Sequence, residues 1–395
     1  MTSRTCITGC RIVSPGVDIP QGSILIEGGR IVAVAPENPE CPENPDNPER
    51  PECPVIDGRG LIAVPGFIDI HSHGRSGFDF CDGSAEAFSA IGRGKLEDGV
   101  TGFLATSLSV STGDLRMLCR QAAAYSANTP DGATLLGVHL EGPFFNPECA
   151  GAQNPAFLKN PDIGLVDELS AIAPVKKVTF SPELPGGEAF TRALAERGIM
   201  PSGGHTAADY DRYALCRDLG MRHLTHFCNV MTPLHHLRFG VVGGGLLDDD
   251  VFVEMICDGV HLCDQMIQLI ARVKGPGRMM LVTDAMRACA MPDGDYSLGG
   301  LPVVVKGGCA RLATGQVAGS SLRYPDGLRR LVRLTGLPLS EAIRATSLNQ
   351  AESLNLGRRG KLEKGFVADI ALLDGNLDVR KTICGGVLKW ERDRQ

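Results

Sequence analysis

The chain has 395 residues, of which 43% are hydrophobic and 22% charged, and its formal net charge is -7 at pH 7. These values are ordinary for a globular protein, and the dispersed acidic balance argues against a nucleic-acid surface, which needs clustered Lys and Arg. The longest apolar stretches are shorter than the roughly 20 residues of a membrane span, so we expect no membrane segment. The opening MTSRTCITGC lacks a basic start followed by an apolar core, and we therefore expect a cytoplasmic protein.

Short β-strands are predicted at both ends of the chain. Residues 24–26 and 31–34 are apolar runs on either side of Gly28-Gly29, a glycine pair suited to a hairpin turn. Similar runs return at 366–373 and 383–390. We therefore expect residues 1–60 and 359–395 to build one small β-sandwich domain, into which a larger domain, 61–358, is inserted.

Residues 36–54 form a proline-rich and acid-rich insertion in the first part of this small domain. Proline recurs at every third position, and an acidic residue follows each of the first six prolines. This period favours polyproline II, which has three residues per turn. The segment could dock a partner or act as a spacer. We favour a solvated loop extension, because long surface insertions cost little free energy.

The large domain alternates short apolar runs with helix-like segments, which is typical of a parallel α/β architecture. Eight such runs over this length predict a (β/α)8 TIM-like barrel, in which chemistry collects at the C-terminal ends of the strands. The eight predicted strands are residues 61–70, 100–107, 134–140, 176–180, 199–203, 221–227, 251–257 and 279–282.

Polar residues follow several of these predicted strands. His71 and His73 follow the first one, and their spacing places both imidazoles on the same face, where they can share a metal ion. A lone residue of this kind is often a structural histidine or a helix cap. A barrel, however, brings all strand ends to one rim, where so many His and acidic groups need a compensating cation. The other residues in this position are Glu141, His205, His226 and Asp284.

Imidazole nitrogens and carboxylate oxygens predict a divalent metal ion, with Zn2+ as the best match and Fe2+ or another first-row ion as alternatives. Such an ion makes bound water nucleophilic near neutral pH and polarises a carbonyl, which points to amide hydrolysis. That reaction needs a group that takes a proton from water and returns it to the leaving nitrogen, and Asp284 is the candidate. His261, beyond the seventh strand, could hydrogen-bond the carbonyl oxygen or could be a surface histidine.

The chain resembles the N-acetylglucosamine-6-phosphate deacetylases of the amidohydrolase superfamily over nearly its whole length. Gly365 to Ile370 also resembles the closing Gly-x-x-Ala-Asp motif of that superfamily. The other motifs that carry the resemblance are His71-Ser72-His73, Glu141-Gly142-Pro143, Gly204-His205-Thr206, Thr225-His226, Asp258-Gly259-Val260-His261 and Thr283-Asp284.

The resemblance implies a role for each of these residues. Glu141, His205 and His226 would hold one metal ion. The His71/His73 pair is similar to the pair in those family members that can bind a second metal ion. Asp284 would be the catalytic acid and base, and a homodimer is implied because the phosphate-binding Arg of this family comes from the neighbouring subunit. The implied substrate-binding residues are Ala152, Gln153, Asn229, Val230, Arg238, His261, Gly319 and Ser320.

Two departures from the family pattern concern the substrate. Gln153 stands where members commonly have His, and Leu237 occupies the usual position of the phosphate-binding Arg, with Arg238 one residue later. The leading prediction is deacetylation of N-acetylglucosamine 6-phosphate in amino-sugar catabolism. The alternatives are an amidohydrolase for an unphosphorylated or different N-acyl amino sugar, and a non-catalytic assembly protein that kept the barrel.

Overall fold

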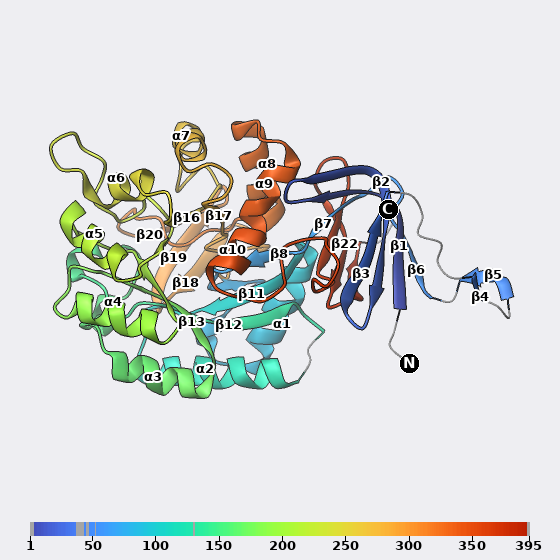
Figure 1. Ribbon diagram of the computed structural model, residues 1–395. Coiled ribbons are helices and arrows are strands. Elements are labelled where there is room, and N and C mark those ends of the chain that lie inside the picture. Colours follow the sequence, from blue (N-terminus) through green and yellow to red (C-terminus); the bar gives the residue numbers. More distant parts are fainter. Residues whose placement is uncertain (1–3, 37–42, 45–46, 52, 129–130, 393–395) are drawn as a thin grey trace.

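The computed structural model describes residues 4–36, 43–44, 47–51, 53–128 and 131–392. The chain forms a large barrel and, beside it, a smaller sheet assembled from its first and last parts (Figure 1). Within the described residues, no helix has the length and apolar character needed to cross a membrane.

The barrel is an 8-stranded parallel sheet whose strands follow one another in chain order. The first and last strands, β8 (Phe67–Asp69) and β17 (Met279–Leu281), meet through the residues that follow them. The Asp284 N–H donates to the His71 carbonyl at 2.9 Å, and Ser72 forms a parallel bridge with Ala285. This confirms the predicted TIM-like barrel. The other strands are β11 (Val100–Thr106), β12 (Thr134–Glu141), β13 (Val175–Phe180), β14 (Met200–Gly203), β15 (His223–Leu224) and β16 (Phe252–Met255).

Helices alternate with these strands and cover the outside of the barrel (Figure 1). Several begin at a capping side chain that accepts a backbone N–H, as Ser84, Ser111 and Asp209 do. The main helices are α1 (Ala85–Glu97), α2 (Thr112–Ala127), α3 (Ile163–Ile172), α4 (Gly187–Glu196), α5 (Tyr210–Asp218), α6 (Gly240–Leu247), α7 (Asp264–Lys274), α8 (Tyr324–Thr335), α9 (Leu339–Ala342) and α10 (Leu348–Ser353).

Several short strands and 3-10 turns lie in the loops between the barrel strands and the helices. A 3-stranded antiparallel sheet lies between β17 and α8 and consists of β18 (Gly294–Leu298), β19 (Leu301–Lys306) and β20 (Cys309–Leu312). The other short elements are β9 (Gly74–Arg75), β10 (Phe78–Asp79) and the 3-10 turns Phe80–Asp82, Pro147–Cys149, Pro155–Phe157 and Ile343–Thr346.

The apolar run 61–70, expected to be one strand, is two strands in different sheets. Its first half is β7 (Ile62–Pro65), which pairs with strands of the small sheet, and its second half is β8 of the barrel. The change occurs at Gly66, whose N–H donates to the Asp369 carbonyl at 2.8 Å. A Cβ at this position would lie 2.3 Å from the Thr101 side chain, so the close approach requires glycine.

The small domain has one 8-stranded sheet with contributions from both ends of the chain, as predicted. Its strands run in the order β23, β22, β21, β7, β1, β2, β3, with β6 beside β1, and they share an isoleucine-rich core that includes Ile12, Ile24 and Ile370. We propose that the large domain begins near Gly66 and not at residue 61 as expected, because β7 belongs to the small sheet, and that it ends near residue 359. The remaining bounds are β1 (Arg4–Ser14), β2 (Val17–Glu27), β3 (Arg30–Ala35), β6 (Val55–Asp57), β21 (Ile370–Leu373), β22 (Val379–Cys384) and β23 (Val387–Glu391).

Only part of the proline-rich insertion is described. β4 (Glu43–Asn44) and β5 (Asn47–Pro51) pair as antiparallel strands instead of the predicted polyproline II. Strand pairing gives backbone groups partners, whereas a polyproline II backbone leaves them to solvent. Residues 37–42, 45–46 and 52, on which the prediction also fell, lie outside the described residues.

Candidate metal centre and substrate pocket

The side chains expected to bind a metal all lie at the C-terminal ends of barrel strands. His71 and His73 follow β8, Glu141 is the last residue of β12, His205 follows β14 and His226 follows β15. Asp284 follows β17, and none of the six residues is more than 6% exposed. The predicted convergence at one rim is therefore present in the structure.

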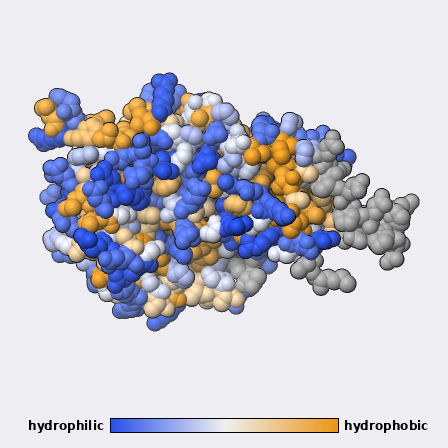
Figure 2. Space-filling view, in the orientation of Figure 1, coloured by the Kyte–Doolittle hydropathy of each residue, from blue (hydrophilic) through white to orange (hydrophobic). Residues whose placement is uncertain are grey.

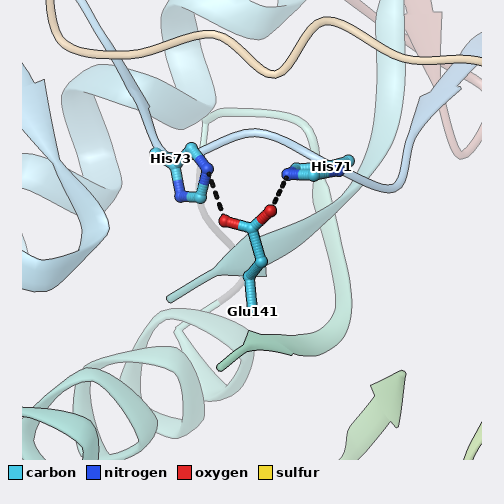
Figure 3. Close-up of side chains that lie close together, drawn as sticks. All are labelled: His71, His73 and Glu141. Carbon is cyan, nitrogen blue, oxygen red and sulfur yellow. Dashed lines mark ion pairs between the residues drawn. The ribbon is translucent and has the colours of Figure 1, made fainter. Parts of the chain in front are cut away.

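Glu141 lies at the centre of this group, and its two carboxylate oxygens face different histidines (Figure 3). Oε1 is 3.3 Å from His71 Nε2, and Oε2 is 3.2 Å from His73 Nε2. Oε1 is also 3.2 Å from His226 Nε2 and 3.7 Å from His205 Nε2. Two groups of three residues could each bind a metal ion, and both include this carboxylate. The first is His71, His73 and Glu141, and the second is Glu141, His205 and His226.

The hydrogen bonds and charges of this group fit a bound cation. His205 Nδ1 donates to the Cys149 carbonyl at 2.9 Å, so its Nε2 presents a lone pair toward Glu141 and His226. The two Nε2 atoms of His205 and His226 are only 3.0 Å apart. Burial acts to lower the pKa of His71, but the carboxylates of Asp284 and Glu141 outweigh it and raise this pKa to about 9. The group thus attracts positive charge, which a divalent ion supplies.

Three of these residues have left-handed backbone conformations. The φ angles are 48° at His205, 33° at His226 and 49° at Asp284. Such conformations cost non-glycine residues about 1–3 kcal/mol each and occur at functional sites. The backbone is held by nearby groups, since Ser181 Oγ donates to the His205 carbonyl at 2.5 Å and Glu254 Oε2 accepts the His226 N–H at 3.2 Å.

A pocket opens above this group and contains most of the residues expected to bind substrate. His73, Glu141, His205, His226 and Asp284 form its floor. Six of the eight expected residues line it, namely Ala152, Gln153, Asn229, Val230, His261 and Gly319. The lining residues that sequence reasoning missed are Leu108, Glu148, Gly151, Leu298, Gln316 and Val317.

Two expected substrate residues do not line the pocket of this chain. Ser320 Oγ donates to the Thr283 carbonyl at 2.5 Å, so its side chain supports the segment that carries Asp284. Arg238 lies in a separate hollow together with Leu237 and other residues of the segment before α6. No Lys or Arg is present among the described residues that line the pocket.

Gln153 and His261 are both held by protein groups. Gln153 Nε2 donates to Glu141 Oε2 at 2.6 Å, and its Oε1 accepts the Ser109 N–H at 2.7 Å. His261 Nδ1 donates to Asp258 Oδ2 at 2.7 Å, which leaves Nε2 available to a ligand. Burial acts to lower the pKa of His261, but Asp258 outweighs it and raises this pKa.

Lys177 and Glu254 are buried charged residues that sequence reasoning missed. Glu254 lies on β16 and pairs with Lys177 of β13, and its Oε2 is 2.9 Å from His71 Nδ1. The available signal was a charge inside an apolar strand, as in Val251-Phe252-Val253-Glu254. Such a charge is rarely buried without a specific partner.

The barrel and its buried His and carboxylate groups define a protein of the amidohydrolase class, and the amidohydrolase family model matches residues 62–389. The N-acetylglucosamine-6-phosphate deacetylase of Lysinibacillus sphaericus is 36% identical over 336 residues, 85% of this chain and 87% of that protein. The chain belongs to the amidohydrolase family and, within it, to the N-acetylglucosamine-6-phosphate deacetylases. This confirms the resemblance, and this family is divalent-metal-dependent.

Two further comparisons bear on the substrate. A variant of the Mycobacterium smegmatis deacetylase, solved in complex with N-acetyl-D-glucosamine-6-phosphate, superposes with a TM-score of 0.89 at 30% identity over 98% of this chain and 99% of that one. The N-acetylgalactosamine-6-phosphate deacetylase of Escherichia coli O157:H7 is 34% identical over 82% of this chain and 86% of that protein. The relatives thus include enzymes named for two different amino-sugar phosphates.

Proposed function

We propose that this chain hydrolyses the acetamide of N-acetylglucosamine 6-phosphate to glucosamine 6-phosphate and acetate, as a cytoplasmic step of amino-sugar catabolism. The observation that carries this proposal is the shared Glu141 carboxylate, which faces four imidazoles and lies beside Asp284 on the floor of a pocket. Membership in the family supports the choice of substrate.

The two sets of ligands each provide a place for a divalent ion. Glu141, His205 and His226 would hold one ion, and His71, His73 and Glu141 a second. We propose Zn2+, because imidazole nitrogen and carboxylate oxygen suit it, although Fe2+ or another first-row ion fits the same ligands. A bound ion lowers the pKa of its water and polarises the amide carbonyl.

Asp284 is the residue that we propose to move protons. Burial alone would raise the pKa of its carboxyl, but the neighbouring His71 and His73 lower it, so the group is ionised and able to accept a proton. Its Oδ1 lies 3.1 Å from His73 Nε2, at the pocket floor. The carboxylate would take the proton from water and return it to the departing nitrogen.

His261 is a second group that we propose to act on the substrate. Its Nδ1 is fixed by Asp258, and the raised pKa favours a protonated ring whose Nε2–H can be donated into the pocket. A donor in this position stabilises the carbonyl oxygen as it gains negative charge.

The phosphate group requires a positive charge that the pocket of one chain does not contain among its described lining residues. Arg238 lies on the segment before α6, which projects from the molecule at the upper left of Figure 1. Figure 2 shows apolar side chains on this projection, where Leu237 is 79% exposed and Leu234 and Phe239 are also exposed. We propose a homodimer in which Arg238 of the partner subunit binds the phosphate.

Arg238→Ala is expected to raise KM for N-acetylglucosamine 6-phosphate roughly 10- to 100-fold, since hydrogen bonds to charged groups contribute about 1.5–3 kcal/mol. Turnover of the unphosphorylated sugar should not change. Steady-state kinetics with both sugars measure this, with the exposed Arg192→Ala on α4 as a control. Equal effects on both sugars would contradict a phosphate contact.

The proposed activity is tested by measuring acetate release from N-acetylglucosamine 6-phosphate, N-acetylglucosamine and N-acetylgalactosamine 6-phosphate. We expect the highest kcat/KM with the first. No preference for phosphate would favour the amidohydrolase of an unphosphorylated amino sugar. Absence of acetate from all three substrates, together with absence of bound metal, would favour a non-catalytic assembly protein.

A further inference from the structure

Glu254 lies inside the barrel, next to the metal-binding histidines but outside both sets of ligands. Its side chain is 0% exposed, as are those of its partners His71 and Lys177. An ionised carboxylate in such a place costs several kcal/mol unless other groups compensate it. The contacts of this carboxylate therefore indicate what it does.

The first contact determines which nitrogen of His71 carries the proton. Glu254 Oε2 lies 2.9 Å from His71 Nδ1, and a carboxylate accepts hydrogen bonds only, so Nδ1 is the protonated nitrogen. The other nitrogen, Nε2, faces Glu141 and Asp284 at 3.3 and 3.5 Å. No described residue hydrogen-bonds to this Nε2, so its lone pair is available to a metal ion once the ring is neutral.

The second contact reaches the other set of ligands. The same Oε2 accepts the backbone N–H of His226 at 3.2 Å. His226 has a φ of 33°, so its backbone is in the left-handed region and benefits from such an anchor. One carboxylate oxygen thus holds the ring of a ligand in one set and the backbone of a ligand in the other.

The third contact keeps the carboxylate in place. Lys177 pairs with Glu254 Oε1, while His71 and His226 contact the other oxygen, Oε2, and Lys177 supplies the compensating charge. Removing either partner alone would leave an unpaired buried charge, which is strongly destabilising. Replacing both by neutral groups of similar volume is the change that leaves the fold most nearly intact.

We propose that Glu254 is a positioning residue for both proposed metal sites, which fixes the His71 tautomer and anchors the His226 backbone. This inference rests on the proposed metal-dependent function. Carboxylates that orient ligating imidazoles in this way generally change metal affinity 10- to 100-fold when they are removed, by order of magnitude. The role assigned to Glu254 is separate from proton transfer, which belongs to Asp284.

Two double variants distinguish the positioning of His71 and His226 by Glu254 from the effect of its ion pair with Lys177. Glu254→Leu with Lys177→Met removes the charges and the acceptor, whereas Glu254→Gln with Lys177→Met removes the charges but keeps an amide oxygen as acceptor. Zn2+ affinity is measured by chelator competition, with thermal unfolding of the same samples. We expect the leucine variant to bind Zn2+ about 10- to 100-fold more weakly than the glutamine variant.

Equal Zn2+ affinity in the two double variants would overturn the positioning role. A wild-type chain that binds no Zn2+ or other divalent ion would instead contradict the proposed function itself, so the two failures are distinguishable. If the leucine variant does not fold, ¹⁵N NMR of histidine side chains in the Zn2+-loaded wild type decides the question. The His71 signal, assigned by its loss in His71→Asn, is expected to report a proton on Nδ1, and a proton on Nε2 would overturn the proposal.

Discussion

Asp284→Asn is expected to lower kcat for N-acetylglucosamine 6-phosphate by about 100- to 10,000-fold, the usual contribution of a general acid–base group. An amide side chain has the same shape as the carboxylate but cannot take a proton from water. Because Glu141 and the four histidines are unchanged, the variant should retain its metal content. Single-turnover and steady-state assays of acetate release, with metal analysis of the same preparation, measure both properties.

The matched control for this variant is Asp167→Asn on α3, where an exposed carboxylate pairs with Arg197 on the surface. It should leave kcat and metal content unchanged, because exposed ion pairs contribute little. Loss of the metal from Asp284→Asn would show that this residue is chiefly a ligand. Retained metal with near wild-type turnover would contradict the proton-transfer role altogether.

Glu141→Gln is expected to remove metal binding from both sites at once, because both sets of ligands share this carboxylate. An amide keeps one acceptor oxygen but loses the negative charge, so Zn2+ affinity should fall by more than the roughly 10- to 100-fold effect of a supporting residue. Acetate release should fall to the background level. Chelator competition and metal analysis measure the loss.

His73→Asn provides the comparison, since His73 belongs to only one of the two sets. This variant should lose metal from that set and retain it in the set of Glu141, His205 and His226. If Glu141→Gln retained as much metal as His73→Asn, Glu141 would not be the shared ligand that its position indicates.

The barrel and the floor of the site could be predicted because both follow from local patterns. Apolar runs that end in a polar residue locate the strand ends, and a parallel barrel brings those ends together without further information. His71, Glu141 and His205, which are far apart in sequence, lie together for this reason. The small domain was predictable from the similar short runs at both ends of the chain.

Other features depend on three-dimensional contacts that a single sequence does not reveal. The run 61–70 changes sheets at Gly66, where the Gly66 N–H donates to the carbonyl of Asp369 and the backbone approaches Thr101, both distant in sequence. The pairing of Glu254 with Lys177 joins two strands that are not neighbours in the sheet. Leu298 reaches the pocket from an inserted antiparallel sheet whose place near the barrel mouth is set by packing.

Some of the expected substrate-binding residues could likewise be predicted from the sequence, and others could not. Ala152 and Asn229 line the pocket because their loops follow barrel strands, as the family motifs imply. Gln153 also lines the pocket, but its Nε2 donates to Glu141, a contact that depends on the path of its loop. Arg238 lies away from the pocket of its own chain, so the phosphate contact proposed for it would need a second subunit.

The central claim is that bound divalent metal and deacetylation of N-acetylglucosamine 6-phosphate belong to the same site. The most direct measurement follows acetate release from this substrate while metal-depleted protein is titrated with Zn2+, with metal content determined on the same samples. We expect no release without metal and a rate that rises in proportion to occupancy until the site or sites are full. A rate that does not depend on bound metal, or fully loaded protein that releases no acetate, would contradict the claim.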